Sequence, residues 1–308
     1  MTAAPLRAAQ VLATGPLTTV QDLGRPGLAH LGVPRSGAAD RGALRLANRL
    51  VGNPEPAAGL EVTLGGLVLR ALGPLTVAVT GAACPLTVDG RPVARNSVLE
   101  LLPDQLLRLD YATAGLRCYL AVRGGVEVPA VLGSRATDTL SGLGPARPQS
   151  GDRLWFGAAP LRWPVLEIAP VPDPPAAAVA LRVVPGPRLL DVGPDQDHAH
   201  RLLAIRWQVG TDSDRVGLRL HPATPEHQEH PAWPSPAGAG SGSLPSEGLV
   251  VGSVQVPPAG APVLFLADHP VTGGYPVIAV VVDADLDRAG QLRPGQLLSL
   301  APVPVPVF

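Results

Sequence analysis

Apolar residues recur along this chain in short runs, rich in Val, Leu and Ala, that alternate with polar positions or stay apolar throughout. Alternation with a period of two, bounded by Gly and Pro, is typical of β-strands. In the first half the pattern predicts strands at residues 6–13, 60–64, 67–70, 75–80, 86–89, 97–101, 106–111 and 117–122. Gly65-Gly66 and Asp89-Gly90 fall between candidate strands and predict tight hairpins, because such turns require a positive φ. We therefore expect an antiparallel meander closed into a barrel.

One segment has helical periodicity instead. Apolar residues at positions 43, 46, 47 and 50 share one helix face, which predicts a helix over residues 43–51. Asp40 is placed to cap its first turn, and Gly52 followed by Pro54 ends it. Arginines on the opposite face are expected to be solvated.

The second half again predicts an all-β domain. Proline and alanine dominate residues 161–179, which we expect to link an N-terminal barrel domain, 1–160, to a C-terminal domain, 180–308. Strands are expected at 181–184, 205–209, 216–220, 249–256, 263–266, 277–283 and 296–300, and a helix at 195–204. Residues 221–243, a low-complexity stretch of Pro, Ala, Gly, Ser and His, are predicted to be a flexible surface insertion.

Composition excludes several classes of protein. A hydrophobic content of 46% with 16% charged residues is that of a globular protein, and a net charge of −1 gives no sign of nucleic-acid binding. No segment is apolar for long enough to cross a membrane, so we expect a cytoplasmic protein. Every basic residue is arginine, which excludes a P-loop lysine, a Schiff base and a biotin-carrying lysine in this chain. The two cysteines, Cys84 and Cys118, lie in apolar strands and are expected to be reduced core residues.

A long glycine- and proline-rich loop follows a brief strand near the N-terminus and is the first candidate site. It carries Gln21, Asp22, Arg25 and Ser36, with glycines and prolines that hold one backbone shape. A long polar loop of fixed shape usually has a function, although a loop that merely closes a barrel end has the same pattern.

Three further features are candidate sites, each with a structural alternative. Arg123-Gly124-Gly125 at a strand end suits an anion clamp or an internal ion pair. Glu61, in an apolar strand, is either paired with an arginine or functional. The segment 272–275, Thr-Gly-Gly-Tyr, offers backbone N–H groups to a carbonyl oxygen, or forms a plain turn. Spacing favours neither a metal site nor a serine nucleophile, and no catalytic residue can be named.

Motifs spread over the chain carry a family resemblance. They include Gly24-Arg25-Pro26-Gly27, Leu60-Glu61-Val62-Thr63-Leu64-Gly65-Gly66, Ala121-Val122-Arg123-Gly124-Gly125, Ser213-Asp214-Arg215-Val216-Gly217, Ser246-Glu247-Gly248, Gly252-Ser253-Val254-Gln255 and Thr272-Gly273-Gly274-Tyr275-Pro276. In these the chain resembles the KipA family. That family includes the C subunit of 5-oxoprolinase together with proteins of the allophanate hydrolase subunit 2 type, and its members are often described as biotin-dependent carboxyltransferases.

The resemblance implies two tandem cyclophilin-like β-barrels and a role in a hetero-oligomer. One implied function is the C subunit of an ATP-dependent 5-oxoprolinase. It would act with a KipI-like B subunit, plus the A subunit of that enzyme, to convert 5-oxo-L-proline to L-glutamate, with ATP used by the complex. A second is the carboxyltransferase component of a biotin-dependent urea or amide carboxylase, with biotin on a partner. A third is a regulatory protein that binds a KipI-type kinase inhibitor.

The resemblance also implies substrate-binding roles. Arg25, Arg123 and Arg215 are expected to hold anionic groups, and Thr272, Gly273, Gly274 and Tyr275 to line an amide. Polar pocket residues are expected to be Gln21, Asp22, Ser36, Glu61, Gly124, Gly125, Glu247 and Gln255. Loops from both halves are expected to converge on one planar carbonyl compound. The family's usual residues before Thr272 are replaced here by Asp268-His269-Pro270-Val271, which leaves the substrate open.

Overall fold

The computed structural model describes residues 7–164, 166–192, 202–224, 244–257 and 261–304. Contacts divide the chain into two compact units, one of residues 1–25 and 36–174 and one of residues 26–35 and 175–308. Each unit is described by itself. No helix in the described ranges combines the length and apolarity that a membrane crossing requires.

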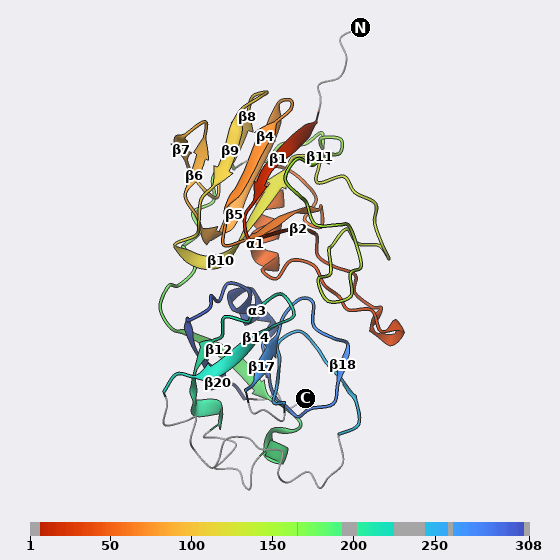
Figure 1. Ribbon diagram of the computed structural model, residues 1–308, viewed down its shortest axis with the longest axis vertical. Helices are drawn as coiled ribbons and strands as arrows, with labels where there is room; N and C mark the ends of the chain where they lie inside the picture. Colours follow the sequence, from red (N-terminus) through yellow and green to blue (C-terminus); the bar gives the residue numbers. More distant parts are fainter. Residues whose placement is uncertain (1–6, 165, 193–201, 225–243, 258–260, 305–308) are drawn as a thin grey trace. The chain divides into compact units, whose positions relative to one another are not determined.

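The first unit is built from two open antiparallel sheets (Figure 1). Its strands are β1 (Ala8–Thr14), β2 (Leu17–Gln21), β3 (Gly59–Thr63), β4 (Leu67–Ala71), β5 (Leu75–Ala83), β6 (Leu86–Val88), β7 (Arg91–Val93), β8 (Val98–Leu101), β9 (Leu106–Leu109), β10 (Ala114–Val122) and β11 (Arg153–Trp155). One sheet has the order β11-β1-β4-β9-β6-β7, and the other has the order β2-β3-β10-β5-β8. The predicted strands are present, but the expected meander and closed barrel are wrong for this unit.

The core of the first unit lies between these sheets. Val11 and Leu69 from one sheet and Leu60 and Leu120 from the other belong to a single buried cluster. Because alternate side chains of a strand share a face, each sheet can present an apolar surface to the other. The two sheets therefore form a sandwich rather than a barrel.

The two glycine turns have different outcomes. Asp89 and Gly90 both have positive φ and join β6 to β7 in a two-residue hairpin, as predicted. Gly65-Gly66 is not a hairpin, because it leads from β3 in one sheet to β4 in the other. Glycine is needed there for close approach, since a Cβ on Gly65 would lie 2.2 Å from the Asp110 carbonyl oxygen.

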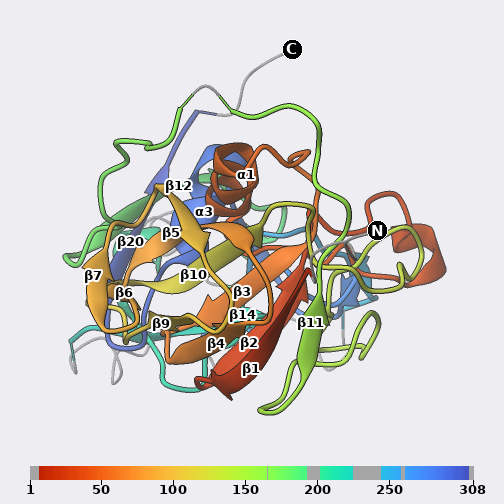
Figure 2. The ribbon, with the colours of Figure 1, turned by 90° about the horizontal axis from the view of Figure 1, so that it is seen from above.

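The predicted helix is α1 (Arg41–Leu50), which packs against β5 and β10 (Figure 2). The Asp40 carboxylate accepts a hydrogen bond from the Ala43 backbone N–H at 2.8 Å, which confirms the predicted cap. Its apolar face buries Leu44 and Ala47. Thr80 of β5 donates to the Ala43 carbonyl at 2.7 Å and so fixes the helix on the sheet.

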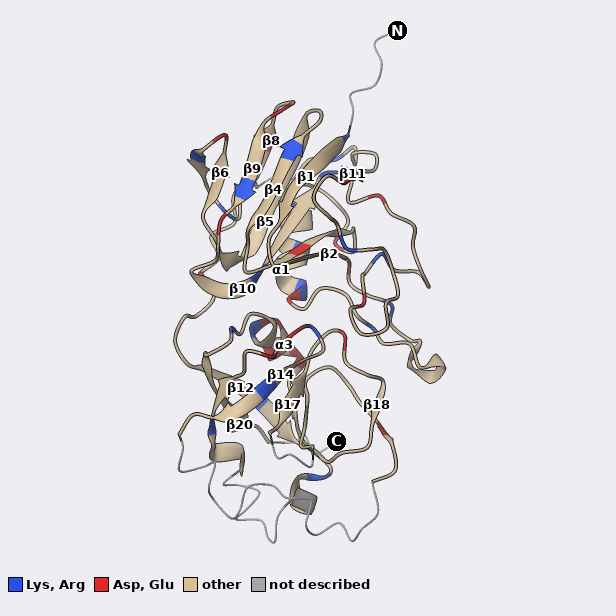
Figure 3. Ribbon diagram, viewed as in Figure 1, with Lys and Arg blue, Asp and Glu red and all other residues tan. Residues whose placement is uncertain are grey.

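The second unit contains a closed seven-stranded barrel of order β12-β19-β16-β17-β14-β13-β20. Its elements are η1 (Ala29–Leu31), β12 (Val179–Pro185), η2 (Leu189–Val192), β13 (Arg206–Val209), β14 (Gly217–Pro222), β15 (Glu247–Gly248), β16 (Ser253–Gln255), β17 (Val263–Phe265), β18 (Thr272–Gly273), β19 (Val277–Val281), α3 (Asp283–Gly290) and β20 (Leu297–Pro302). Parallel pairing of β12 with β20 closes the ring, and Trp207, Leu218 and Ile278 fill its interior. In Figure 3 charged residues are spread over this unit and the first, and the strands are largely uncharged.

The mainly β architecture is confirmed, and the second half has several local corrections. Residue 283 begins α3 rather than ending a strand. Residues 221–222 belong to β14 rather than to the predicted insertion, of which 225–243 lie outside the described residues. Most of the helix expected at 195–204 also lies outside them. Within the predicted linker, the Ala169 backbone N–H donates to the Asn96 carbonyl at 2.8 Å. The predicted domain boundaries stay a prediction.

Candidate functional site

Asp22, directly after β2, organises the first predicted loop. One carboxylate oxygen accepts from the Gly24 N–H at 2.8 Å and the Ser134 hydroxyl at 2.6 Å, and the other from the Arg135 N–H at 2.6 Å. Three donors occupy this carboxylate, so Asp22 joins the loop to residues 134–135. In this structure Asp22 therefore holds the loop in place through hydrogen bonds within the chain.

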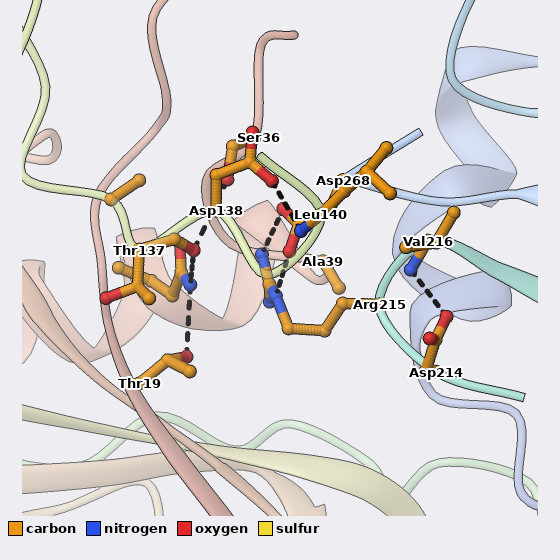
Figure 4. A network of polar contacts seen from close by, with 12 residues as sticks. Thr19, Ser36, Ala39, Thr137, Asp138, Leu140, Asp214, Arg215, Val216 and Asp268 are labelled. Atoms are coloured by element: carbon orange, nitrogen blue, oxygen red, sulfur yellow. Dashed lines mark hydrogen bonds and ion pairs between the residues drawn. The ribbon is translucent and has the colours of Figure 1, made fainter. Parts of the chain in front are cut away.

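Gln21, the last residue of β2, binds the same returning segment. Its amide nitrogen donates to the Thr19 hydroxyl at 3.0 Å and to the Thr137 carbonyl at 2.8 Å (Figure 4). The side chain is fully buried, and its Oε1 has no hydrogen-bond partner among the described residues. Ser36, also buried, places its hydroxyl 3.5 Å from the same carbonyl.

Arg25 binds the same segment one residue earlier, at Ala136. Its Nη2 donates to the Ala136 carbonyl oxygen at 2.6 Å, and the side chain is 2% exposed. Within the described residues its Nε and Nη1 have no hydrogen-bond partner. Four predicted site residues, Gln21, Asp22, Arg25 and Ser36, are thus brought together around residues 134–137.

Glu61 is part of a buried polar network beside the start of α1. Its Oε2 accepts from the Tyr119 hydroxyl at 2.8 Å and from the Ala39 N–H at 3.0 Å, and its Oε1 lies 3.4 Å from Arg117 Nε. Burial and the adjacent Glu61 charge raise the pKa of Tyr119 well above its usual value. Glu61 is thus paired with an arginine, and its role in substrate binding stays a prediction.

Arg123, Gly124 and Gly125 form a second, separate cluster. The Arg123 guanidinium donates to the carbonyls of Val51, Pro160 and Arg162 and stacks 3.8 Å from the Trp163 ring centroid. Burial, with the charge of Arg7, lowers the pKa of Arg123. Its donors are directed at backbone carbonyls, so in this structure Arg123 joins three segments of the first unit.

Packing requires the first of the two glycines beside it, and backbone conformation favours the second. A Cβ on Gly124 would lie 2.2 Å from the Gly157 carbonyl oxygen, and Gly124 N–H donates to Asn53 Oδ1 at 2.7 Å. Gly125 has a φ of 72°, in the left-handed region.

The two cysteines are free and buried, as predicted, although their separation in sequence gave no sign that they meet. Cys118 Sγ lies 3.0 Å from Cys84 Sγ. This hydrogen bond lowers the pKa of Cys84 and raises that of Cys118. The pair is enclosed in the main core of the first unit.

In the second unit Arg215 forms a buried bidentate ion pair with Asp268 (Figure 4). The next residue, His269, is 7% exposed and has its Nδ1 2.7 Å from the Pro270 carbonyl oxygen. The atypical His-Pro segment is therefore locally ordered by its own backbone.

The remaining predicted residues gather at the small β15–β18 ribbon. Glu247 pairs with Gly273 across the ribbon and is ion-paired with Arg188. The hydrogen bond from Arg188 lowers the pKa of Glu247. Gln255 of β16 donates from Nε2 to the Tyr275 carbonyl at 2.9 Å.

Close packing explains the glycine in this ribbon. A Cβ on Gly273 would lie 2.6 Å from the Gln255 amide nitrogen. Gly274 follows directly, and Tyr275 is 47% exposed. Six predicted residues thus lie in the ribbon or directly beside it: Glu247, Gln255, Thr272, Gly273, Gly274 and Tyr275.

Sequence reasoning missed the partners that hold these residues. Arg117 and Tyr119 lie two residues apart on β10, so both are on one face of an otherwise apolar strand, and this spacing was the available signal. Asn53, between Gly52 and Pro54, gave no such signal. Among the described residues no group of three or more His, Cys, Asp or Glu is arranged to hold a metal ion. The convergence of loops from both halves stays a prediction.

Comparison with known proteins identifies the family. Residues 31–302 match the model of the carboxyltransferase domain, subdomain A and B. The chain belongs to this carboxyltransferase family. It is 34% identical to the 5-oxoprolinase C subunit of Escherichia coli (strain K12) over 290 residues, which cover 93% of this chain and 88% of that protein. The corresponding Haemophilus influenzae protein is 33% identical, with coverage of 92% and 88%.

Solved structures agree on the family fold. The K. lactis urea amidolyase structure superposes with a TM-score of 0.86 at 29% identity and covers 98% of this chain. This chain spans only 19% of the length of that larger protein. The family match includes residues of both units, so both are parts of one family module.

Proposed function

We propose that this chain is the C subunit of an ATP-dependent 5-oxoprolinase. It acts with a KipI-like B subunit, plus the A subunit of the same enzyme, to hydrolyse 5-oxo-L-proline to L-glutamate. The observation that carries the proposal is the length of the match. The alignment with the E. coli 5-oxoprolinase C subunit covers 93% of this chain and 88% of that protein, whereas a urea amidolyase alignment covers 17% of that enzyme. A match over nearly the whole of the curated subunit supports the same role for this chain.

The polar clusters support a substrate-holding role. Opening a cyclic amide places negative charge on its carbonyl oxygen, and preorganised donors stabilise that charge. The β15–β18 ribbon carries Thr272 and Gly273 beside the Gln255 amide, whose position is fixed by Tyr275. These groups would orient the amide.

Among the described residues, the N-termini of α1 and α3 do not suit a nucleotide phosphate. A phosphate at a helix N-terminus needs free N–H groups and no competing anion. Asp40 already accepts from the first turn of α1, and the first turn of α3 carries Asp283 and Asp285. We propose that the complex uses ATP, and we assign no ATP site to this chain.

Reconstitution tests the proposal. This chain would be co-expressed with the two partner proteins, and glutamate release from 5-oxo-L-proline measured with and without ATP. We expect ATP-dependent glutamate formation that needs all three chains. Turnover at an unchanged rate without this chain would contradict the proposal.

The structural similarity to urea amidolyase favours a second candidate, the carboxyltransferase component of a biotin-dependent carboxylase. The TM-score of 0.86 supports it. Because the chain has no lysine, biotin would be carried by a partner. This candidate requires activity that avidin abolishes, and avidin-resistant turnover would contradict it.

A further inference from the structure

The three arginines expected to hold anions differ in one respect. Arg215 is paired with Asp268, and Arg123 is directed at backbone carbonyls. Arg25 is only 2% exposed, yet of its three guanidinium nitrogens only Nη2 has a hydrogen-bond partner among the described residues. A buried guanidinium without a counter-charge is costly, because burial removes its hydration without a compensating ion.

Gln21 complements this cation with an acceptor. Its orientation is fixed, because the Thr137 carbonyl can only accept, so the amide nitrogen must face it at 2.8 Å. Gln21 Oε1 is therefore the atom left without a partner among the described residues. Because buried polar groups are as a rule hydrogen-bonded, this oxygen is a candidate acceptor for an N–H donor.

Backbone geometry places these two side chains together. Gln21 binds the carbonyl of Thr137, and Arg25 binds that of Ala136, the preceding residue. The Thr137 N–H donates to the Val20 carbonyl at 2.9 Å, which holds this segment beside the end of β2. The side chains that carry the two unpaired donor nitrogens and the unpaired acceptor thus bind adjacent carbonyls of one segment.

Gly144 passes over the same carbonyl and leaves room for the guanidinium. A Cβ there would lie 2.0 Å from the Ala136 carbonyl oxygen and 3.3 Å from Arg25 Nη2. Its φ of 95° also requires glycine. Asp138, two residues before Leu140, accepts from the N–H groups of Leu140 and Ser141 and fixes the loop that leads to Gly144 (Figure 4).

We infer that Arg25 and Gln21 form a subsite for a small ligand with a carboxylate next to an N–H group. The carboxylate accepts from Arg25, and the N–H donates to Gln21 Oε1. The further identification of this ligand as 5-oxo-L-proline, which has both groups on adjacent atoms, rests on the proposed function. The subsite selects and orients the ligand and makes no covalent step.

Calorimetric titration of the full chain tests the subsite with three ligands. These are 5-oxo-L-proline, 2-pyrrolidinone, which lacks the carboxylate, and N-methyl-5-oxo-L-proline, which lacks the N–H. We expect the first to bind about 10- to 100-fold more tightly than either analogue, the usual effect of a charge-assisted or buried hydrogen bond. The N-methyl ligand tests Gln21 without altering the protein.

Variants of Arg25 test whether the preference for the ligand with a carboxylate depends on this residue. In Arg25→Gln we expect the preference over 2-pyrrolidinone to fall to within about twofold, while the preference over the N-methyl ligand remains. Arg25→Lys, which keeps the charge but not the fork, should retain an intermediate preference. The surface variant Arg49→Gln is the matched control and should behave as wild type. Because Arg25→Gln removes an uncompensated buried charge, its Tm without ligand should not fall below that of wild type.

The outcomes separate this inference from the proposed function. A wild-type chain that binds none of the three ligands, or an undiminished carboxylate preference in Arg25→Gln, overturns the subsite. If the reconstituted complex shows no 5-oxoprolinase activity while the ligand preferences follow Arg25, the function is wrong and the subsite stands. If the complex is active and its KM is unaffected by Arg25→Gln, the subsite is wrong and the function stands.

Discussion

Arg215 and Asp268 form two parallel hydrogen bonds, with Nε 2.9 Å from Oδ2 and Nη2 3.0 Å from Oδ1, and both side chains are at most 1% exposed. The pair lies where β14 begins and β17 has just ended, so it joins two barrel strands. An arginine expected to hold a ligand anion thus has an anion of its own chain. Arg25, which the sequence likewise predicts to hold an anion, has no carboxylate partner among the described residues.

Breaking the Arg215–Asp268 pair should destabilise the second unit. In Asp268→Asn the guanidinium stays buried without its full counter-charge, and we expect the free energy of unfolding to fall by about 3–5 kcal/mol. The double variant Arg215→Met/Asp268→Leu should lose less than Asp268→Asn, because no unpaired charge is left. Urea denaturation of both variants checks this. Equal or greater loss in the double variant would contradict it.

Gly273→Ala should disturb the β15–β18 ribbon at the Gln255 amide. The added Cβ would lie 2.6 Å from Gln255 Nε2, so either the amide or the ribbon must move, at a cost of about 1–3 kcal/mol. Gly248→Ala is the matched control, because a Cβ there meets nothing within 4 Å. Under the proposed function we expect kcat/KM of the reconstituted complex to fall at least about tenfold for the first variant and to stay within about twofold for the control, as a positioning role requires. Similar kinetics for both variants would exclude the ribbon from the reaction.

Tyr119→Phe should weaken the network around Glu61. The hydroxyl donates to Glu61 and accepts from the Asp40 N–H at 2.8 Å, so its removal leaves two buried groups short of a partner and costs about 1–3 kcal/mol. Tyr111→Phe, at a position 66% exposed, should change stability by less than about 0.5 kcal/mol. Because burial raises the pKa of Tyr119, its phenolate absorbance should appear above the usual pH range and be absent from the variant. Equal stability losses in the two variants would show that the network contributes nothing.

Arg123→Lys should lower stability without altering ligand preference. A lysine cannot donate to the three carbonyls and stack on Trp163 in the same geometry, and we expect a loss of about 2 kcal/mol. Thermal unfolding measures the loss, and titration with 5-oxo-L-proline checks the preference. A variant of unchanged stability that loses ligand affinity would instead support the anion-clamp interpretation of Arg123.

The sequence predicts those parts of the fold that depend on local pattern. Period-two alternation located β4 and β10, and Asp40 with Gly52 marked the limits of α1, because caps and strand faces are local properties. Closure into a barrel is a property of pairing between distant strands, so the pattern did not reveal that β3 and β4 belong to different sheets. Gly65-Gly66 has the composition of a hairpin, but its glycines serve a close approach to a distant loop.

Residue type and local context were enough to select the candidate site residues. Their roles depend on contacts with residues that are distant in the chain, and the sequence does not show which residues those are. Arg25, Arg123 and Arg215 cannot be distinguished by their neighbours in the chain. They differ in which of the described groups faces the guanidinium. Arg123 faces several carbonyls, Arg215 faces a carboxylate, and Arg25 faces a single carbonyl with no counter-charge. A similar limit hid α3, because the apolar run ahead of it predicted a strand that reached residue 283, and the Asp285 carboxylate is held by Arg182, far earlier in the chain.

Asp285 should control part of the acid stability of the second unit. Its carboxylate accepts from the Arg182 backbone N–H at 2.8 Å and from Arg182 Nε and Nη2 at 3.1 and 2.9 Å. These hydrogen bonds lower the pKa of Asp285. A carboxylate whose folded-state pKa is lowered contributes stability above its unfolded pKa of about 3.9, and loses it as the pH falls through the folded value.

Asp285→Asn should therefore be less stable than wild type at neutral pH by about 1–2 kcal/mol, a value reduced because Arg182 is half exposed. The difference should shrink below about pH 4, as the wild-type carboxylate is protonated. Asp212→Asn, which breaks the exposed Asp212–Arg219 pair, is the control and should differ by less than about 1 kcal/mol at every pH. Urea midpoints measured from neutral to acid pH test this, and a difference that stays constant down to acid pH would show that Asp285 acts by packing rather than by charge.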